Sequence, residues 1–324
     1  MKKQINRISK IFLILVIVIS LTGCTKTLTT KDKKVIKNPE TGQSLTANIL
    51  CQPKNKKTLE VYEKNKKILK KEYKIEIKKL PECKDLKVNS GGYEGLWTNI
   101  FVKPLAWFII QVGNIVNNYG LALIITSLII RFIVFPLTRK SAMQSELLKE
   151  AQKDLNKIEK KYANKNDQES LMKKSQEMTM VYKKHGINPV AGCLVALIQL
   201  PLFIAFFEAI NRVPAIFEDK FLTLQMGTTP MIGITNGNYL YGLLIILIAA
   251  TTYFSFKFST ADAQASAGSA GMNMKKMPMI MTIMIVVMGM FMTSAIGIYW
   301  VTTNLFTVIQ NILIKRSREK NGKV

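Results

Sequence analysis

A charged side chain, Arg131, stands well inside an apolar stretch of this sequence. Arg131 lies about six residues, or ~9 Å along a helix, before the stretch ends at Leu137. An arginine at that depth in a membrane helix costs about 2.5–3.5 kcal/mol on insertion scales. Either its side chain extends to the polar boundary, or it faces a water-filled cavity. The residue alone leaves both readings open.

Amide side chains occupy other apolar stretches. Gln199 stands beside Pro201, and Asn304 and Gln310 share a later stretch. A proline inside a helix frees a backbone carbonyl, which then needs another donor or water. Single amides in such helices more often form helix-to-helix hydrogen bonds. Together with Arg131, however, they indicate a polar groove among these helices, with Arg131, Gln199 and Asn304 as its candidate residues.

Several familiar chemistries have no residues to support them. The chain has 1 histidine, His185, so histidine-based triads and histidine-rich metal sites have almost no residues to be built from. No C-x-x-C pair and no phosphate-binding G-x-x-x-x-G-K-[ST] loop occurs. We therefore expect no catalytic residue, no metal, no cofactor and no enzymatic activity.

The charge and the apolar residues are segregated along the chain. Of 324 residues, 48% are hydrophobic, and 46 Lys+Arg face 21 Asp+Glu, for a net charge of +25. The apolar residues form uninterrupted blocks and the lysines lie between them, whereas a DNA- or RNA-binding protein mixes the two. This distribution indicates an all-α, polytopic membrane protein.

The amino terminus resembles an export signal. Lys2, Lys3, Arg7 and Lys10 precede a short apolar run that ends at Leu21, and Cys24 follows. This pattern predicts a signal peptide over residues 1–23. Leu21-Thr22-Gly23-Cys24 resembles a bacterial lipobox, which implies that Cys24 carries lipid. The alternative is a retained signal anchor.

Residues 24–95 form a basic segment outside the apolar blocks. Cys51 and Cys83 could form a disulfide, worth about 3–4 kcal/mol in the chain-entropy model, or could remain two thiols. Tyr73, Ile75 and Ile77 alternate with charged residues and predict a half-buried strand. The lysines could bind anionic lipid headgroups or wall polymers, or could simply form a solvated face.

The apolar blocks predict five membrane spans. Residues 96–118, interrupted by polar residues and carrying Trp97 and Trp107, predict an amphipathic helix on the outer surface. The spans are expected at 119–138, 189–210, 239–256 and, as an antiparallel pair, within 277–314 at 277–292 and 295–314.

Loop charge sets the orientation of these spans. Residues 139–188 contain 12 Lys+Arg and the tail 315–324 contains 5, whereas the loop 211–238 holds only Arg212 and Lys220. We therefore place 139–188, the loop 257–276 and the carboxyl terminus in the cytoplasm. Segment 24–95 lies outside, because a long exported domain crosses regardless of its charge.

The segment 139–188 reads as a helical hairpin. Asp167 is a plausible N-cap for its second helix, and Gly186 and Asn188-Pro189 end that helix. The apolar seam steps by threes and fours through Met143, Leu147, Ala151, Leu155, Ile158 and Tyr162, then Leu171, Ser175, Met178 and Tyr182.

Motifs at three places resemble YidC-type membrane protein insertases, relatives of the mitochondrial Oxa and chloroplast Albino insertases. The resemblance covers about residues 96–315, and with a lipobox and five spans it is to the Gram-positive form. It rests on R-x-x-x-x-P-L at Arg131–Leu137, on Asn188-Pro189 with Gly192-Cys193-Leu194 and Leu197–Pro201, and on Ile298–Val301 with Asn304-Leu305-Phe306.

The resemblance implies a function and partners. A hydrated groove would receive the acidic tail of a nascent membrane protein, and Arg131 would attract it without ATP hydrolysis. The implied partners are nascent membrane proteins and membrane lipids, with the Sec translocon and the ribosome as further candidates; DNA and small-molecule substrates are not expected. The rival is a secondary transporter or channel, but no repeated halves and no central intramembrane acid support it.

Overall fold

The computed structural model describes residues 25–165, 167–267 and 277–320, which fall into two compact units. Unit 1 holds the described residues up to Ser127, with Leu202–Ile246 and Met288–Tyr299. Unit 2 holds Leu128–Pro201 with the described parts of Leu247–Val287 and Trp300–Val324. The predicted signal peptide and Cys24 lie outside the described residues.

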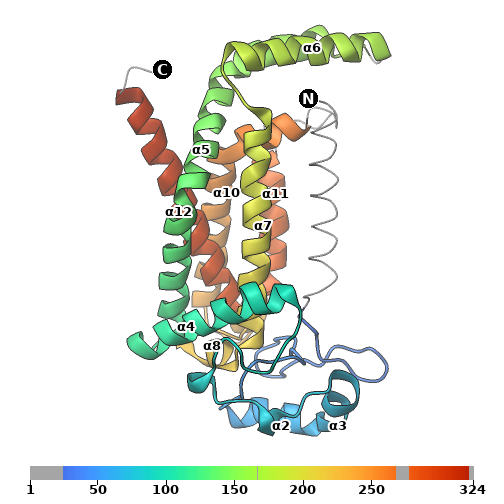
Figure 1. Ribbon diagram of the computed structural model, residues 1–324, viewed down its shortest axis with the longest axis vertical. Coiled ribbons are helices and arrows are strands. Elements are labelled where there is room, and N and C mark those ends of the chain that lie inside the picture. Colours follow the sequence, from blue (N-terminus) through green and yellow to red (C-terminus); the bar gives the residue numbers. More distant parts are fainter. Residues whose placement is uncertain (1–24, 166, 268–276, 321–324) are drawn as a thin grey trace. The chain divides into compact units, whose positions relative to one another are not determined.

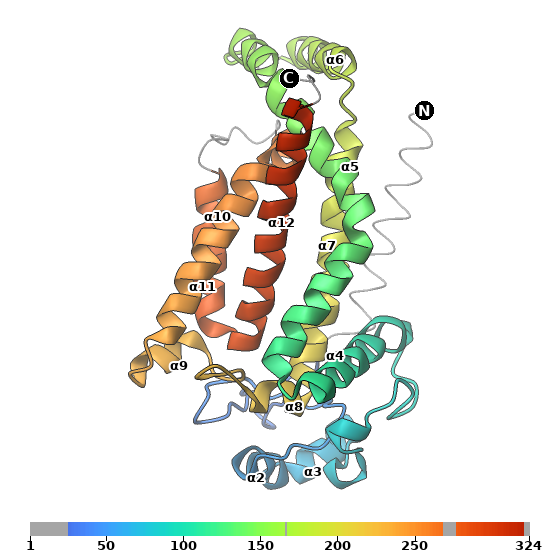
Figure 2. The ribbon, with the colours of Figure 1, turned by 90° about the vertical axis from the view of Figure 1, so that its left-hand side faces the viewer.

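Unit 2 is built from helices alone. Parts of five helices run alongside one another in it, and α6 (Gln168–Lys184) lies across one end of this bundle (Figures 1 and 2). The five are α5 (Tyr119–Lys161), α7 (Pro189–Arg212), α10 (Leu240–Ala267), α11 (Met277–Phe291) and α12 (Ser294–Lys320).

The helix α5 is longer than the span predicted from the sequence. It runs without a break from Tyr119 to Lys161 and contains Pro136. The apolar stretch and the first helix of the hairpin are therefore one element. This continuity fixes the rotation of the hairpin's seam relative to Arg131, because both lie on the same helix.

The hairpin packs around a small apolar cluster. Ala151 and Leu155 of α5 pack with Ile187, and Met178 and Tyr182 of α6 lie against them. Two residues of the predicted seam are instead exposed, Met143 at 41% and Leu171 at 52%. Asp167 caps α6 as expected, because its carboxylate accepts the Ser170 N–H at 2.8 Å.

Residues 25–95, here called the basic module, have their own small core in unit 1. Its helical elements are α2 (Lys56–Lys64), α3 (Lys66–Ile68), η1 (Leu69–Tyr73), η2 (Ile77–Lys79) and η3 (Cys83–Asp85). Tyr62, Leu69 and Ile77 are buried against Leu28 and Leu45. Cys51 and Cys83 are joined by a disulfide, with a Cα–Cα distance of 4.8 Å.

The strand predicted around Ile75 is wrong. Tyr73 ends the π-helical turn η1, Lys74 has a left-handed φ of 57°, and Ile77 begins the 3₁₀ turn η2. Tyr73, Ile75 and Ile77 nevertheless all pack against the module's core. The alternation of apolar and charged residues therefore predicted correctly which side chains are buried. An irregular segment can show the same alternation as a strand.

The loop between α7 and α10 joins several helix ends of unit 1. It contains α8 (Pro214–Glu218), α9 (Pro230–Thr235) and the antiparallel pair β1 (Lys220–Phe221) and β2 (Leu224–Gln225). Its Asp219 accepts the Tyr119 N–H of α5 at 2.6 Å. Its Thr228 carbonyl accepts the Ser294 N–H of α12 at 3.0 Å. The loop thereby fixes the first turns of two long helices.

The segment predicted as a surface helix forms η4 (Thr98–Val102) and α4 (Lys103–Val116). Asn117, at φ 54°, turns the chain sharply, and α4 runs crosswise to the start of α5 (Figure 1). One face of α4 is buried through Leu105, Ile109 and Ile110, whereas Ile115 is 79% exposed.

Length and hydropathy identify four helices in the described part of the chain that could cross a membrane. They are Thr98–Val116, Tyr119–Lys161, Leu240–Phe258 and Ser294–Lys320, and Pro278–Phe291 is apolar but shorter. Three of the four contain predicted spans, and the fourth is the predicted surface helix. The protein is therefore mostly helical, while the count of five spans stays a prediction.

Candidate functional site

The candidate site is centred on α5, where Arg131 is only 6% exposed. Three further polar residues on this helix are also buried: Thr138 at 9% and Ser141 and Ser145 at 2% each. They follow Arg131 at intervals of seven, three and four residues, so all four lie on one helical face. We call Arg131, Thr138, Ser141 and Ser145 the polar stripe of α5.

Two hydroxyls of the polar stripe have unusual surroundings. Among the described residues, neither Ser141 Oγ nor Ser145 Oγ has a hydrogen-bond partner, although both atoms are buried. Buried hydroxyls are nearly always paired with protein or with ordered water, and leaving one unpaired costs about 1–3 kcal/mol. The stripe is therefore chemically suited to contact with water.

The amides of α12 bond to two different neighbouring helices. Asn304 Nδ2 donates to Thr252 Oγ1 of α10 at 3.1 Å, and Trp300 Nε1 donates to the same oxygen at 3.0 Å. Gln310 Oε1 accepts from Thr138 Oγ1 of α5 at 3.2 Å. Asn304 and Gln310 thus form the helix-to-helix hydrogen bonds that single amides in apolar helices commonly make.

Aromatic and ionic contacts hold α12 along the polar stripe. Phe306 meets the edges of Phe132 and Phe135 of α5, with ring centroids 5.2 and 6.4 Å apart. Farther along, Arg318 pairs with Glu150 at 3.0 Å. These contacts lie on both sides of the Thr138–Gln310 bond, so α5 and α12 stay together over several turns.

The three predicted groove residues all lie in unit 2, on three different helices. Arg131 is on α5, Gln199 on α7 and Asn304 on α12. Gln199 and Asn304 are half-buried. Of the three, Asn304 is engaged with α10 through Thr252.

Sequence reasoning missed Thr138, Ser141 and Ser145. Their helical spacing from Arg131 was visible in the sequence, but Ser141 and Ser145 fall in the segment that was assigned to the hairpin, and Thr138 is the last residue of the predicted span. Thr252 was missed as well, because a single threonine in an apolar helix usually bonds to its own backbone.

The single histidine belongs to the hairpin. His185 Nε2 lies 3.4 Å from Asp154 Oδ2, and Lys184 Nζ lies 3.5 Å from the same oxygen. The hydrogen bond to His185, followed by the charge of Lys184, holds the pKa of Asp154 below its usual range. Among the described residues no group of three or more His, Cys, Asp or Glu side chains could hold a metal ion.

The sequence of this chain is similar to those of one family of known proteins. Residues 111–321 match the family described as 60Kd inner membrane protein. A membrane protein insertase YidC of Oceanobacillus iheyensis is 38% identical over 225 residues, covering 69% of this chain and 85% of the relative. A membrane protein insertase YidC 2 of Bacillus anthracis is 36% identical over 230 residues, covering 71% and 85%.

A third relative agrees with these two. The membrane protein insertase MisCA of Bacillus subtilis is 35% identical over 220 residues, which cover 68% of this chain and 79% of the relative. The family match includes the polar stripe of α5, Gln199 and Asn304, and leaves the basic module outside. This chain is therefore a multi-pass membrane protein that belongs to the YidC-type family of membrane protein insertases.

Proposed function

We propose that this protein inserts nascent membrane proteins into the lipid bilayer through a hydrated groove along the polar stripe of α5. The observation that carries the proposal is a buried arginine within the apolar stretch of α5, in line with buried hydroxyls farther along the same helix. Relatives named as membrane protein insertases support the reaction class. No covalent chemistry and no nucleotide is needed for this function.

In this mechanism, the arginine of the polar stripe supplies positive charge and the serines hold water. Arg131 supplies a fixed positive charge, which attracts an acidic client tail out of the cytoplasm. Water held by Ser141 and Ser145, which lie just beyond the cytoplasmic end of the predicted span, lowers the cost of bringing a charged tail from there to Arg131. The apolar segment of the client meanwhile moves along the outer surface of the helices into lipid. Gln199 and Asn304 contribute polar atoms from α7 and α12.

The proposed topology follows from the distribution of charge. The hairpin, residues 257–276 and the tail 315–324 lie in the cytoplasm, and the basic module lies outside with Cys24 lipidated. The loop predicted from residue 257 is helical at its start, because α10 continues to Ala267. The five spans are 119–138, 189–210, 239–256 and the two within 277–314. The crosswise direction and one-sided burial of α4 support its placement as a helix at the outer interface.

The cytoplasmic surface offers sites for partners that deliver clients. The hairpin and the carboxyl tail are basic, and anionic lipid or ribosomal RNA would bind such surfaces. We include the Sec translocon among the proposed partners only because clients with large outer domains need a second pathway.

The test is reconstitution with a single client. Purified protein in liposomes is given a short single-span client with an acidic tail, and protection of the tail from added protease is measured. We expect protection with wild type, a loss of about tenfold or more with Arg131→Ala, and recovery with Arg131→Lys. Arg139→Ala is the matched control, since Arg139 is exposed and lies just beyond the same span.

Each result has a defined meaning. Insertion that is unchanged in Arg131→Ala would remove Arg131 from the mechanism and leave the function in place. A client with a neutral tail should be less sensitive to the substitution than the acidic one. Solute flux through the liposomes without any insertion would overturn the proposal in favour of a transporter or channel.

A further inference from the structure

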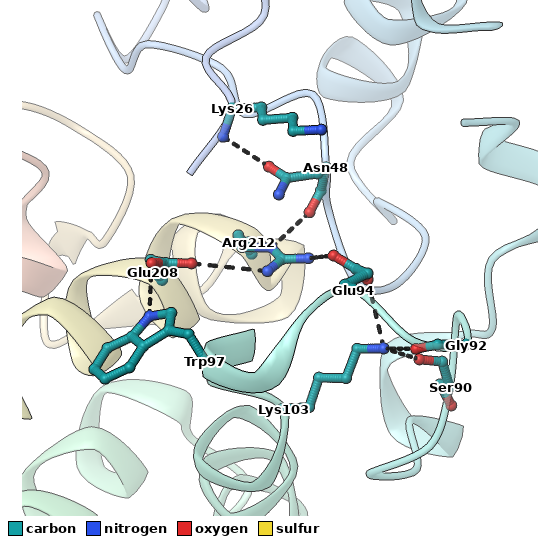
Figure 3. A network of polar contacts seen from close by, with 9 residues as sticks. All are labelled: Lys26, Asn48, Ser90, Gly92, Glu94, Trp97, Lys103, Glu208 and Arg212. Carbon is teal, nitrogen blue, oxygen red and sulfur yellow. Dashed lines mark hydrogen bonds and ion pairs between the residues drawn. The ribbon is translucent and has the colours of Figure 1, made fainter. Parts of the chain in front are cut away.

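The second set of buried charges lies in unit 1 and is separate from the polar stripe. Arg212 and Glu208 of α7 are each 1% exposed, and Lys103 of α4 is 2% exposed. Figure 3 shows them with Glu94 of the basic module in one continuous network. Arg212 pairs with Glu94, and its Nη1 lies 3.8 Å from Glu208 Oε2. Lys103 Nζ lies 3.5 Å from Glu94.

Neutral groups complete this network. Trp97 Nε1 donates to Glu208 Oε1 at 2.9 Å, and Lys103 Nζ donates to the Ser90 carbonyl at 2.7 Å. Two cations thus meet two anions, with no net charge left over. Removing one member of such a buried set leaves its partner uncompensated, which is strongly unfavourable.

Arg212 also binds the basic module directly. Its Nε donates to the Asn48 carbonyl at 2.7 Å, while its own carbonyl accepts the Leu50 N–H at 2.8 Å. Cys51 follows immediately and is bonded to Cys83, so the disulfide connects this contact to the rest of the module. A single residue of α7 therefore holds the module by its side chain and its backbone.

The basic module also contacts the loop after α7. Glu218 Oε2 accepts the Lys54 and Asn55 N–H groups at 2.9 and 3.1 Å. The Thr229 N–H donates to the Thr41 carbonyl at 2.9 Å. Gly42, at φ 70°, approaches so closely that an added Cβ would lie 2.4 Å from Ile232 Cδ1. Glycine is therefore required at this contact.

We propose that Arg212 is a positioning residue that docks the basic module onto α4, α7 and the loop after α7. The docked module is a permanent cap within unit 1, and it holds the start of α4 and the end of α7 in place during insertion. A lipid-tethered arm that moves freely would need none of these buried contacts. The effect on insertion rests on the proposed function, whereas the docking does not.

Hydrogen exchange of the full-length protein in lipid nanodiscs tests the docking. The Leu50 and Thr229 amides should exchange slowly in wild type. Arg212→Gln should speed exchange across residues 41–55 on the order of 100-fold, with a smaller effect in Arg212→Lys. Lys220→Gln, an exposed change in the same loop, should leave it unaltered. Fast exchange of both amides in wild type would overturn the proposal.

The amides of the hairpin in unit 2 report whether a variant is folded. If Arg212→Gln raises exchange there as well, Glu94→Gln replaces it, because Glu94 is 31% exposed and its loss breaks the same ion pair. If the single variants Arg212→Gln and Glu94→Gln are both correctly folded and the module stays protected in each, Arg212 does not hold the module.

Insertion by the same variants tests the positioning role. Insertion should fall severalfold in Arg212→Gln and recover in part in Arg212→Lys. Normal insertion by a variant whose module has been released would overturn this role. Wild type that protects its module amides but inserts no client would contradict the proposed function and would still support the docking.

Discussion

The buried ion network of unit 1 and the polar stripe of unit 2 both place polar groups in apolar surroundings, but the partners of those groups differ. In the network, Arg212 and Lys103 meet Glu94 and Glu208 in ion pairs, so charge is balanced within the protein. On the stripe, the hydroxyls of Ser141 and Ser145 have no partner among the described residues. Other buried polar atoms of unit 1 also have no hydrogen-bond partner there, so the contrast is between these two sites and not between the units. We infer that the network stabilises a fixed arrangement, whereas the stripe suits the contact with water that the proposed function requires.

The family match and the basic module occupy different parts of the chain. The match begins at residue 111 and includes all of unit 2 up to residue 321. The basic module precedes it. The buried network of unit 1 joins the module to Glu208 and Arg212, which lie within the match. A helix end inside the matched region thus contacts a module outside it.

Breaking the network of unit 1 should have the largest effect on stability. Glu208→Leu removes the acceptor of Trp97 Nε1 and leaves Arg212 with Glu94 alone. We expect a loss of about 3–5 kcal/mol in the free energy of unfolding of unit 1. It is measured by denaturant unfolding in bicelles, with Trp107→Phe and Trp300→Phe in every protein so that Trp97 is the fluorescent residue. Glu208→Gln keeps an acceptor and should cost less. Equal stability of all three proteins would contradict a structural role for the network.

Removing the disulfide should have the second-largest effect, on the stability of the basic module. Cys51 and Cys83 are 32 residues apart, and a loop of that size is worth about 3–4 kcal/mol in the chain-entropy model. Cys51→Ser with Cys83→Ser should therefore make the module sensitive to protease and leave the hairpin resistant. Cleavage that begins in the hairpin would show that the two units do not unfold separately.

Replacing the two serines of the polar stripe by valine should slow insertion without lowering the stability of the fold. In Ser141→Val with Ser145→Val, two unpaired buried hydroxyls become apolar, which is close to neutral or stabilising for the fold. Loss of the water that they hold should slow insertion of acidic-tailed clients severalfold, as measured by protease protection. Insertion at the wild-type rate in a stable double variant would mean that the stripe is a packing surface.

The smallest effect is expected at the cap of α6. Asp167 accepts the Ser170 N–H, and this bond lowers the pKa of the carboxyl. Because the folded pKa is lowered, the stabilisation is present above the ordinary carboxyl pKa and is lost as the pH falls through the lowered value. Asp167→Ala should weaken α6 about fivefold in its folding constant near neutral pH, with a smaller difference as the pH is lowered, measured by circular dichroism.

The sequence predicted those features that depend on local pattern. Pro189 begins α7, Asp167 caps α6, and the helices α10, α11 and α12 fall on the predicted apolar blocks. Each of these rests on hydropathy or on capping chemistry that acts within a few residues. Arg131 could be singled out for the same reason, since a charge within an apolar block is visible without a structure.

Features that depend on distant segments were missed. Arg212 was counted only as an orientation charge, but Glu94, 118 residues away, and Glu208 bury it in an ion network. The prediction of a strand at Ile75 was wrong. Packing of every second side chain against the module's core, and not a strand, produced the alternation of apolar and charged residues. Thr252 became a partner of Asn304 only through the packing of α10 against α12.

The central claim is that the polar stripe of α5 is hydrated from the cytoplasm. The direct measurement is labelling of single cysteines in proteoliposomes with a membrane-impermeant thiol reagent, after Cys193→Ser removes the native thiol of α7. Arg131→Cys and Thr138→Cys lie on the stripe within the predicted span 119–138, and Ile133→Cys, at a position where the native side chain is 72% exposed, is the lipid-facing control. The account predicts labelling at both stripe positions from the cytoplasmic side and none at 133. Stripe positions that resist the reagent as fully as 133 would contradict it.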